Sequence, residues 1–182
     1  MIKKKIDFLF IIIASLIYSI AIPIDSEIVE HMSIINGNIP YSANNPRLLS
    51  LVNDNSNFQN LIIYFFIKNN FSPNLISYTY YFICSVISFS ALYNLSKVFS
   101  KNKYINLMLP LILIFYSFVN THFYGLKYPY SYFNYSNIGT FLAILTTCFL
   151  FQKKNFLFYV FFIITSLIHF VWGAYVFIFF IF

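Results

Sequence analysis

The sequence predicts an all-α protein, a polytopic bundle of five or six transmembrane helices. Composition is the first observation that supports this fold class, because hydrophobic residues make up 60% of the chain and charged residues only 9%. A soluble globular chain carries roughly 25% charged residues, so this composition indicates a lipid bilayer as the surroundings. The second observation is that the apolar residues, which give a mean hydropathy of +0.75, gather into long segments.

Five apolar segments approach the length of about 20 residues that a helix needs to cross the hydrocarbon core. The first, 8–24, follows Lys3, Lys4 and Lys5. A signal peptide is the competing interpretation, but the apolar run is longer than such a peptide needs and no small-residue cleavage site precedes Pro23. We therefore predict an uncleaved first span. The other predicted spans are 75–96, 105–120, 138–151 and 156–182.

The last segment, 156–182, is unusually long. If helical at ~1.5 Å per residue it measures about 40 Å, more than the ~30 Å of a bilayer core. His169, Trp172 and Gly173 interrupt it, so one tilted helix and two short helices that meet near His169–Gly173 are both consistent with it. The segment ends at Phe182 with no flanking charge. We therefore expect this chain to be a fragment, the N-terminal part of a longer polytopic protein.

The distribution of lysine predicts the orientation. With a cytoplasmic N-terminus, the loops at 25–74 and 121–137 lie outside, and Arg47, Lys68 and Lys127 are the only basic residues there. This arrangement follows the positive-inside bias and indicates an integral protein of a bacterial inner membrane. The net charge of +6 then reflects orientation and requires no nucleic-acid partner. Eight of the eleven basic residues would be cytoplasmic: Lys3, Lys4, Lys5, Lys97, Lys101, Lys103, Lys153 and Lys154.

In this orientation the outer face collects the residues that could carry chemistry. All three histidines lie there, with His169 in the outer half of the last segment or at its break. Four of the five acidic residues lie there as well, within the first outer loop: Asp25, Glu27, Glu30 and Asp54. This enrichment indicates an outward-facing polar site.

The first outer loop begins with a predicted amphipathic surface helix that Gly37 can end. Asp25 lies where the span meets this helix, and a low dielectric there raises a carboxyl pKa toward that of a general base. A simple N-cap explains Asp25 as well. Glu27 and His31 are four residues apart and could share a metal ion or form a solvated ion pair. The apolar residues at helical spacing are Ile28, Val29, Met32 and Ile35.

The second outer loop carries five tyrosines between 124 and 135. They form either an interfacial aromatic belt or a platform on which sugar rings and prenyl chains stack. Tyr128 and the nearby His122 are candidate substrate contacts, and Lys127 is a cation that could meet a lipid phosphate. His169 costs free energy inside an apolar segment unless it has a partner. It is therefore a functional candidate, although a packed, hydrogen-bonded histidine is an equal explanation.

Two stretches of the chain resemble known membrane proteins. Asp25-Ser26-Glu27-Ile28-Val29-Glu30-His31-Met32, followed by Asn36-Gly37-Asn38-Ile39-Pro40-Tyr41, resembles the N-terminus of GT-C integral-membrane glycosyltransferases. That family includes the protein O-mannosyltransferases and the aminoarabinose transferases of lipid A. The stretch Ser166-Leu167-Ile168-His169-Phe170-Val171-Trp172-Gly173 is similar to a helix break in multi-span bacterial proteins and in exopolysaccharide polymerases of the EpsG/Wzy type.

The GT-C resemblance implies transfer of a sugar from a polyprenyl-phosphate donor to a glycan or lipid acceptor at the outer face. Asp25 would be the catalytic base, with Glu27 as a second catalytic carboxylate. A divalent cation, or the cations Arg47 and Lys127, would stabilise the departing phosphate. Further candidates for substrate binding are Asp54, His122, Tyr128 and His169. A non-enzymatic multi-span subunit and a transporter fragment remain the alternatives.

Overall fold

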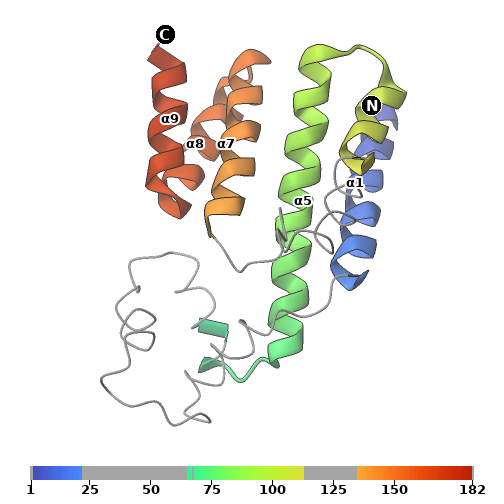
Figure 1. The fold of residues 1–182 in the computed structure, drawn as a ribbon, viewed down its shortest axis with the longest axis vertical. Helices are drawn as coiled ribbons and strands as arrows, with labels where there is room; N and C mark the ends of the chain where they lie inside the picture. The colour runs from blue at the N-terminus through green and yellow to red at the C-terminus, as the bar shows by residue number, and fades with distance from the viewer. Residues whose placement is uncertain (1, 22–64, 67, 113–134, 182) are drawn as a thin grey trace, which may run out of the picture.

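The computed structural model of this chain describes residues 2–21, 65–66, 68–112 and 135–181, and all regular structure within them is helical. The all-α prediction is therefore confirmed for this part of the chain. Besides the short helix Lys103–Ile112, the described helices are α1 (Ile2–Ala21), α5 (Pro73–Phe99), α7 (Tyr135–Phe151), α8 (Asn155–Ile168) and α9 (Phe170–Ile181) (Figure 1).

The apolar segments predicted from the sequence are helical where the structure describes them, with a break at His169. Segment 75–96 lies inside α5, and Asn74–Phe99 is the one described helix that is both long and apolar enough to cross a membrane. The amphipathic helix predicted after Asp25 lies outside the described residues. The remaining apolar helices are shorter, at 10–17 residues: Asp7–Ile20, Lys103–Ile112, Ile138–Phe151, Asn155–Ile168 and Phe170–Ile181.

The local sequence explains where α5 begins. Ser72 is its N-cap, and the Ser72 side chain accepts a hydrogen bond from the backbone N–H of Leu75 at 3.3 Å. Pro73 follows at the first helical position, where the missing N–H costs nothing because that group has no partner inside the helix. The helix ends at Phe99, and the backbone N–H of Ser100 bonds to the carbonyl of Ser96 at 2.8 Å.

Helix α5 is central to the bundle: it packs against α1 on one side and α7 on the other, and α7 packs in turn against α8 and α9 (Figure 1). Helix α1 runs antiparallel to α5, and α7 runs parallel to α5. We call the end where α1 begins and α5 and α7 finish the basic end, because Lys97, Lys101, Lys103, Lys153 and Lys154 lie there. The opposite end is where α1 finishes and α5 and α7 begin, at staggered levels: α7 begins, and α8 meets α9, much nearer the basic end than the point where α5 begins (Figure 1).

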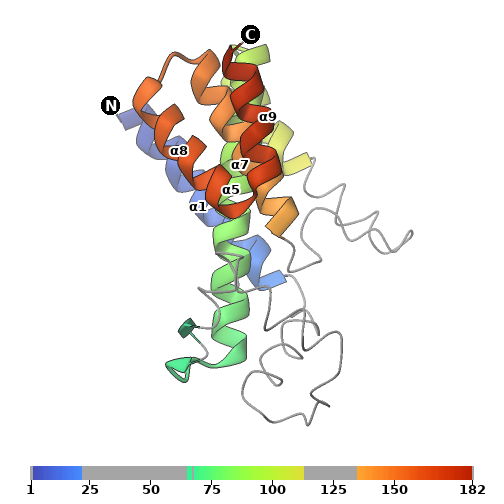
Figure 2. The same cartoon turned by 90° about the vertical axis from the view of Figure 1, so that its left-hand side faces the viewer.

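Segment 156–182 forms two helices rather than one, which decides between the two interpretations of the sequence. Helix α8 ends at Ile168, and His169 adopts an extended conformation (φ −150°, ψ 98°). Its backbone N–H still bonds to the carbonyl of Thr165 at 2.8 Å. Helix α9 then turns back along α8 as an antiparallel hairpin (Figure 2), with Phe158 stacked on Phe180 at 5.2 Å between ring centroids.

Two glycines permit the close packing at the turn of this hairpin. A Cβ at Gly173 would lie 2.8 Å from the Cα of Ser166, so α9 leaves the turn in direct contact with the backbone of α8. A Cβ at Gly139, in the first turns of α7, would lie 2.7 Å from the Cβ of His169 and 2.8 Å from Cδ1 of Trp172. The turn therefore lies against the start of α7, near the opposite end.

Helix α1 buries two serines beside Ile11, while most of its large apolar residues are exposed. Ser15 and Ser19 are 0% and 2% exposed, whereas Phe8, Ile17 and Ile20 are all more than 60% exposed. This is the reverse of the pattern expected for a surface helix in water. Helix α5 also buries two serines, Ser85 and Ser88. Small hydroxyl residues let two helices approach closely, as they do at helix interfaces in lipid.

A hydroxyl pair joins α7 to α8. Thr146 and Thr165 are both fully buried, and their Oγ1 atoms lie 3.1 Å apart. Each hydroxyl also reaches a carbonyl one turn earlier in its own helix, Leu142 at 2.6 Å and Phe161 at 2.7 Å. The two hydroxyl groups have two protons for these three short contacts. The hydroxyl that donates to the other helix therefore shares its proton with a backbone carbonyl of its own helix.

The hairpin packing leads to a prediction about Gly173. Gly173→Ala should lower the free energy of unfolding by about 1–3 kcal/mol, the usual cost of overpacking a tight contact, because the new methyl meets the backbone of Ser166. Thermal unfolding in detergent, followed by fluorescence of the single tryptophan, Trp172, measures this. Val171→Ala, at a position that is 53% exposed, is the control and should change little. Equal stability of both variants would contradict the packing.

Candidate functional site

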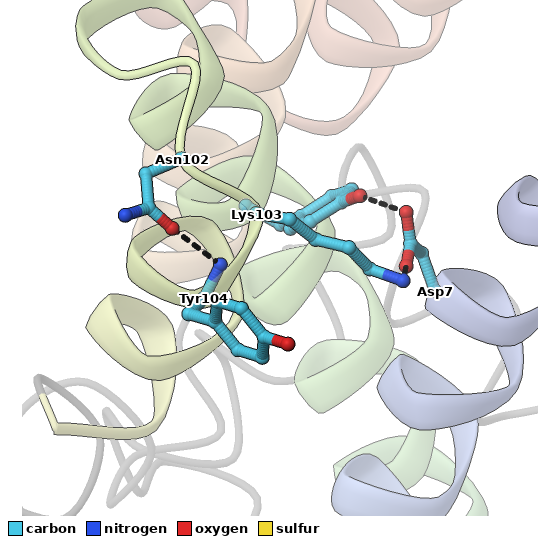
Figure 3. A network of polar contacts seen from close by, with 5 residues as sticks. Asp7, Asn102, Lys103 and Tyr104 are labelled. Carbon is cyan, nitrogen blue, oxygen red and sulfur yellow. Dashed lines mark hydrogen bonds and ion pairs between the residues drawn. The ribbon is translucent and has the colours of Figure 1, made fainter.

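The polar cluster best defined in the structure lies at the basic end, around Asp7. The hydroxyl of Tyr93 donates a hydrogen bond to Asp7 Oδ2 at 2.6 Å, and the ammonium of Lys103 lies 2.9 Å from Asp7 Oδ1. Figure 3 shows Asp7 of α1 facing Lys103 at the start of the helix Lys103–Ile112, and Tyr93 belongs to α5. The Asp7 side chain is only 15% exposed. A single carboxylate therefore joins three helical segments.

Neighbouring groups hold this cluster in place. The ammonium of Lys97 lies over the Tyr93 ring, 3.9 Å from its centroid, which is a close cation–π contact. The side chain of Asn102 caps the following helix by accepting a bond from the backbone N–H of Tyr104 at 2.9 Å (Figure 3). This cap fixes the helical turn that carries Lys103, and so directs its ammonium toward Asp7.

Opposing effects act on the pKa of Asp7, which lies one residue before the predicted span. Burial raises the pKa, because it disfavours the charged form. The hydrogen bonds from Tyr93 and Lys103, together with the positive charges of Lys103 and Lys97, lower the pKa and outweigh burial. The result is a pKa below the ordinary value of 3.8. Asp7 is therefore ionised at neutral pH and already engaged, which suits a structural role better than that of a general base.

A second polar chain fastens α5 to α7 at the same end. The amide of Gln152 donates to Asn94 Oδ1 at 3.2 Å, and the ammonium of Lys154 donates to Gln152 Oε1 at 2.5 Å. Asn94 follows Tyr93 directly in the sequence, so successive residues of α5 bond to different neighbours. In the described part of the chain, no three His, Cys, Asp or Glu side chains come together as a metal site.

Most residues that the sequence predicts for the functional site lie outside the described residues. They are Asp25, Glu27, Arg47, Asp54, His122, Lys127 and Tyr128. Of the predicted set the structure describes His169, and it places this residue at the break between α8 and α9, partly buried against Gly139. Its ring lies 6.3 Å from that of Trp172. The predicted break at His169–Gly173 is therefore present, and His169 lies near the opposite end.

The backbone also indicates where the two outer segments attach. Segment 22–64 leaves the end of α1, and residues 65–72 lead into the start of α5, both at the opposite end (Figure 1). Segment 113–134 follows a helix that runs away from the basic end, and it enters α7 at the opposite end. The residues predicted for the site thus belong to segments joined to the bundle on the side of His169, away from the lysines.

Comparison of the chain with family models, curated proteins and solved structures finds no match. The functional assignment therefore depends on the residues and their arrangement alone.

Sequence reasoning missed the role of Asp7. Asp7 lies next to a predicted span and among lysines, away from the four acidic residues of the first predicted outer loop. The sequence therefore offered no reason to include it among the candidate site residues. One signal could have identified it: a single carboxylate amid several lysines is the natural ion-pair partner of one of them. Tyr93 and Asn94, a polar pair inside the predicted span 75–96, were a second signal, since polar groups at such depth need partners.

The Asp7 cluster leads to a prediction about stability. Asp7→Asn should lower the free energy of unfolding at neutral pH by about 1–2 kcal/mol, because the amide loses the charge that strengthens the bond from Tyr93. The ion pair adds less, since Lys103 is 43% exposed and water screens it. Thermal unfolding of the two proteins in detergent measures the difference, and Lys101→Gln, an exposed change nearby, is the control.

The same comparison has an expected pH dependence. Because folding lowers the pKa of Asp7, its contribution is complete above the unfolded value near 3.8 and is lost as the pH falls through the lower folded value. The difference in free energy of unfolding between wild type and Asp7→Asn should therefore decrease only below about pH 4. A gap that already closes between pH 8 and pH 5 would contradict this assignment.

Proposed function

We propose that this chain is an integral membrane protein whose basic end faces the cytoplasm. Three features support the membrane placement. Helix α5 is long and apolar enough to cross a bilayer, α1 turns its serines inward and its large apolar residues outward, and the hairpin exposes residues such as Phe156 and Phe170, both 79%. Water would disfavour this much exposed hydrocarbon, whereas lipid does not.

The charge asymmetry of the bundle supports the orientation. The basic end carries five described lysines beyond α1, while Lys68 is the one described lysine near the start of α5. Lysine in cytoplasmic loops is what sets the topology of membrane proteins.

Cysteine labelling tests this orientation. In intact cells, an impermeant maleimide should label Lys68→Cys, and it should label Lys101→Cys only after the membrane is permeabilised. Both positions are exposed, and the native Cys84 and Cys148 are buried, so they should not compete for the label. Labelling of Lys101→Cys in intact cells would reverse the proposed orientation.

We further propose that the outer side of the bundle transfers a sugar from a polyprenyl-phosphate donor to a glycan or lipid acceptor. One observation carries this proposal: both segments that contain the predicted acids and cations join α1, α5 and α7 at the helix ends away from the lysines (Figure 1). Residues far apart in the sequence can therefore meet at one membrane face, as a donor anchored by its prenyl chain requires.

The proposed chemistry needs a base and a cationic site. Asp25 accepts the proton of an acceptor hydroxyl or amine as the acceptor attacks the anomeric carbon. The bond from that carbon to the phosphate oxygen breaks, and polyprenyl phosphate leaves with the electron pair. Arg47 and Lys127, or a divalent ion, stabilise the charge on the departing phosphate. Glu27 supports Asp25, and the remaining candidates contact the sugar and the lipid: Asp54, His122, Tyr128 and His169.

Substitution of Asp25 tests this mechanism. Asp25→Asn should reduce transfer by about 10²–10⁴-fold, the contribution typical of a general base. Membranes that contain the chain within its native protein are assayed with polyprenyl-phosphate-linked mannose and aminoarabinose as donors. Glu30→Gln is the matched control, because it removes a carboxylate from the same segment at a position without an assigned role, and it should retain activity. Transfer that is equal in Asp25→Asn and wild type would remove Asp25 from the mechanism.

Transport is a second candidate, favoured by the broken helix at His169. Membrane transporters bind substrates at discontinuous helices of this kind. The two functions differ in what they need from Asp25. Transport that depends on His169 but tolerates Asp25→Asn would favour the second candidate over sugar transfer.

A further inference from the structure

An apolar groove of about 250 Å³ runs between α5, α7 and α9. At the basic end its lining includes Phe99, Phe151 and Phe179, one from each helix. Toward the opposite end it is lined by Thr140 and Trp172. The groove is thus a channel along the side of the bundle, open to the surroundings and parallel to the helices.

The length of the groove fits one leaflet of a bilayer. Along α7 it extends from Thr140 to Phe151, about 17 Å at ~1.5 Å per residue. Half of a ~30 Å hydrocarbon core is roughly 15 Å.

The charge at the mouth of the groove selects the headgroup. Helix α5 ends at Phe99, and Lys101 follows two residues later; helix α7 ends at Phe151, and Lys153 follows at the same spacing. Both lysines are exposed. Asp7 is the one acidic residue among the described residues, and it already bonds to Tyr93 and Lys103. Two exposed lysines therefore follow the ends of two helices that line the groove, and the one carboxylate among the described residues already bonds to other groups.

We propose that this groove binds an acyl chain of an anionic phospholipid whose headgroup lies between Lys101 and Lys153. The three phenylalanines surround the first carbons of the chain, and its end reaches Trp172 and Thr140. The proposal depends on the membrane placement of the bundle, but it is independent of sugar transfer. It assigns the site to the lipids of the leaflet at the basic end.

Trp172 makes the proposal measurable, because it lines the groove and is the single tryptophan of the chain. The chain is reconstituted in phosphatidylcholine vesicles that contain brominated phosphatidylglycerol, or brominated phosphatidylcholine, at equal mole fractions. Bromine quenches indole fluorescence only at close range. We expect brominated phosphatidylglycerol to quench Trp172 more strongly than brominated phosphatidylcholine at every mole fraction. Each of the two lysines should raise the affinity for the anionic lipid over the neutral lipid about fivefold.

Charge-matched variants separate this site from a general attraction of lysine for anionic lipid. The double variant Lys101→Gln/Lys153→Gln should abolish the preference for phosphatidylglycerol. The double variant Lys101→Gln/Lys68→Gln removes the same total charge but only one lysine of the site. It should retain about half of the free-energy difference between binding of the two lipids. Thr147→Phe, which fills the groove lining, should reduce quenching by both lipids.

The outcomes are distinguishable. Equal quenching by the two lipids, or a preference that survives in Lys101→Gln/Lys153→Gln, would overturn the headgroup assignment and leave the proposed membrane placement intact. Quenching by neither lipid would show that the groove is closed to lipid, which also overturns the proposal. Flotation of the chain with the vesicles is measured first. A chain that does not float would contradict the membrane placement together with the lipid site.

Discussion

The hydrogen bond from Tyr93 to Asp7 is the contact on which the arrangement of the first helices depends. Tyr93 lies near the end of α5, and the residue after it, Asn94, bonds to Gln152 at the end of α7. Two successive residues of one helix point in different directions, so α5 holds α1 with the first and α7 with the second. These two hydrogen bonds fix how far α1 and α7 are shifted along α5, and both lie at the same height in the bundle. Apolar packing alone specifies register weakly, because one aliphatic contact resembles the next.

Elsewhere the bundle relies on small hydroxyl residues. Buried serines on α1 and α5 and the pair Thr146–Thr165 between α7 and α8 lie among the apolar core residues, while many further phenylalanines and isoleucines are exposed. In water the apolar effect would favour the reverse. In lipid the outside gains nothing from burial, and close approach with internal hydrogen bonds holds helices together. A sequence rich in phenylalanine can build such a bundle because its large side chains need no partners within the protein.

Hydropathy predicted the helices well, since an apolar run has few alternatives to a helix when its backbone groups must bond internally. It could not decide whether 156–182 forms one helix or two. The break depends on Gly173, where a Cβ would meet the backbone of Ser166, and that contact exists only after α9 has folded back. The Asp7 cluster was missed for a related reason. Residues 7, 93 and 103 are distant in sequence, and the pairing that joins them follows from the antiparallel path of α1 and α5. The outer acids remain predictions, because they lie outside the described residues.

If the bundle lies in a membrane as proposed, the short hairpin has a consequence for the shape of the surrounding bilayer. Helices α8 and α9 have 14 and 12 residues, about 21 Å and 18 Å, whereas α5 has 27 residues, about 40 Å. Helices α1, with 20 residues, and α5 are long enough to cross a hydrocarbon core of ~30 Å, whereas the two helices of the hairpin are not. Such hydrophobic mismatch is relieved when the bilayer thins locally. A membrane deformed on one side of the protein would bring headgroups of the outer leaflet closer to the level of His169, and would shorten the path from the aqueous surface to that residue.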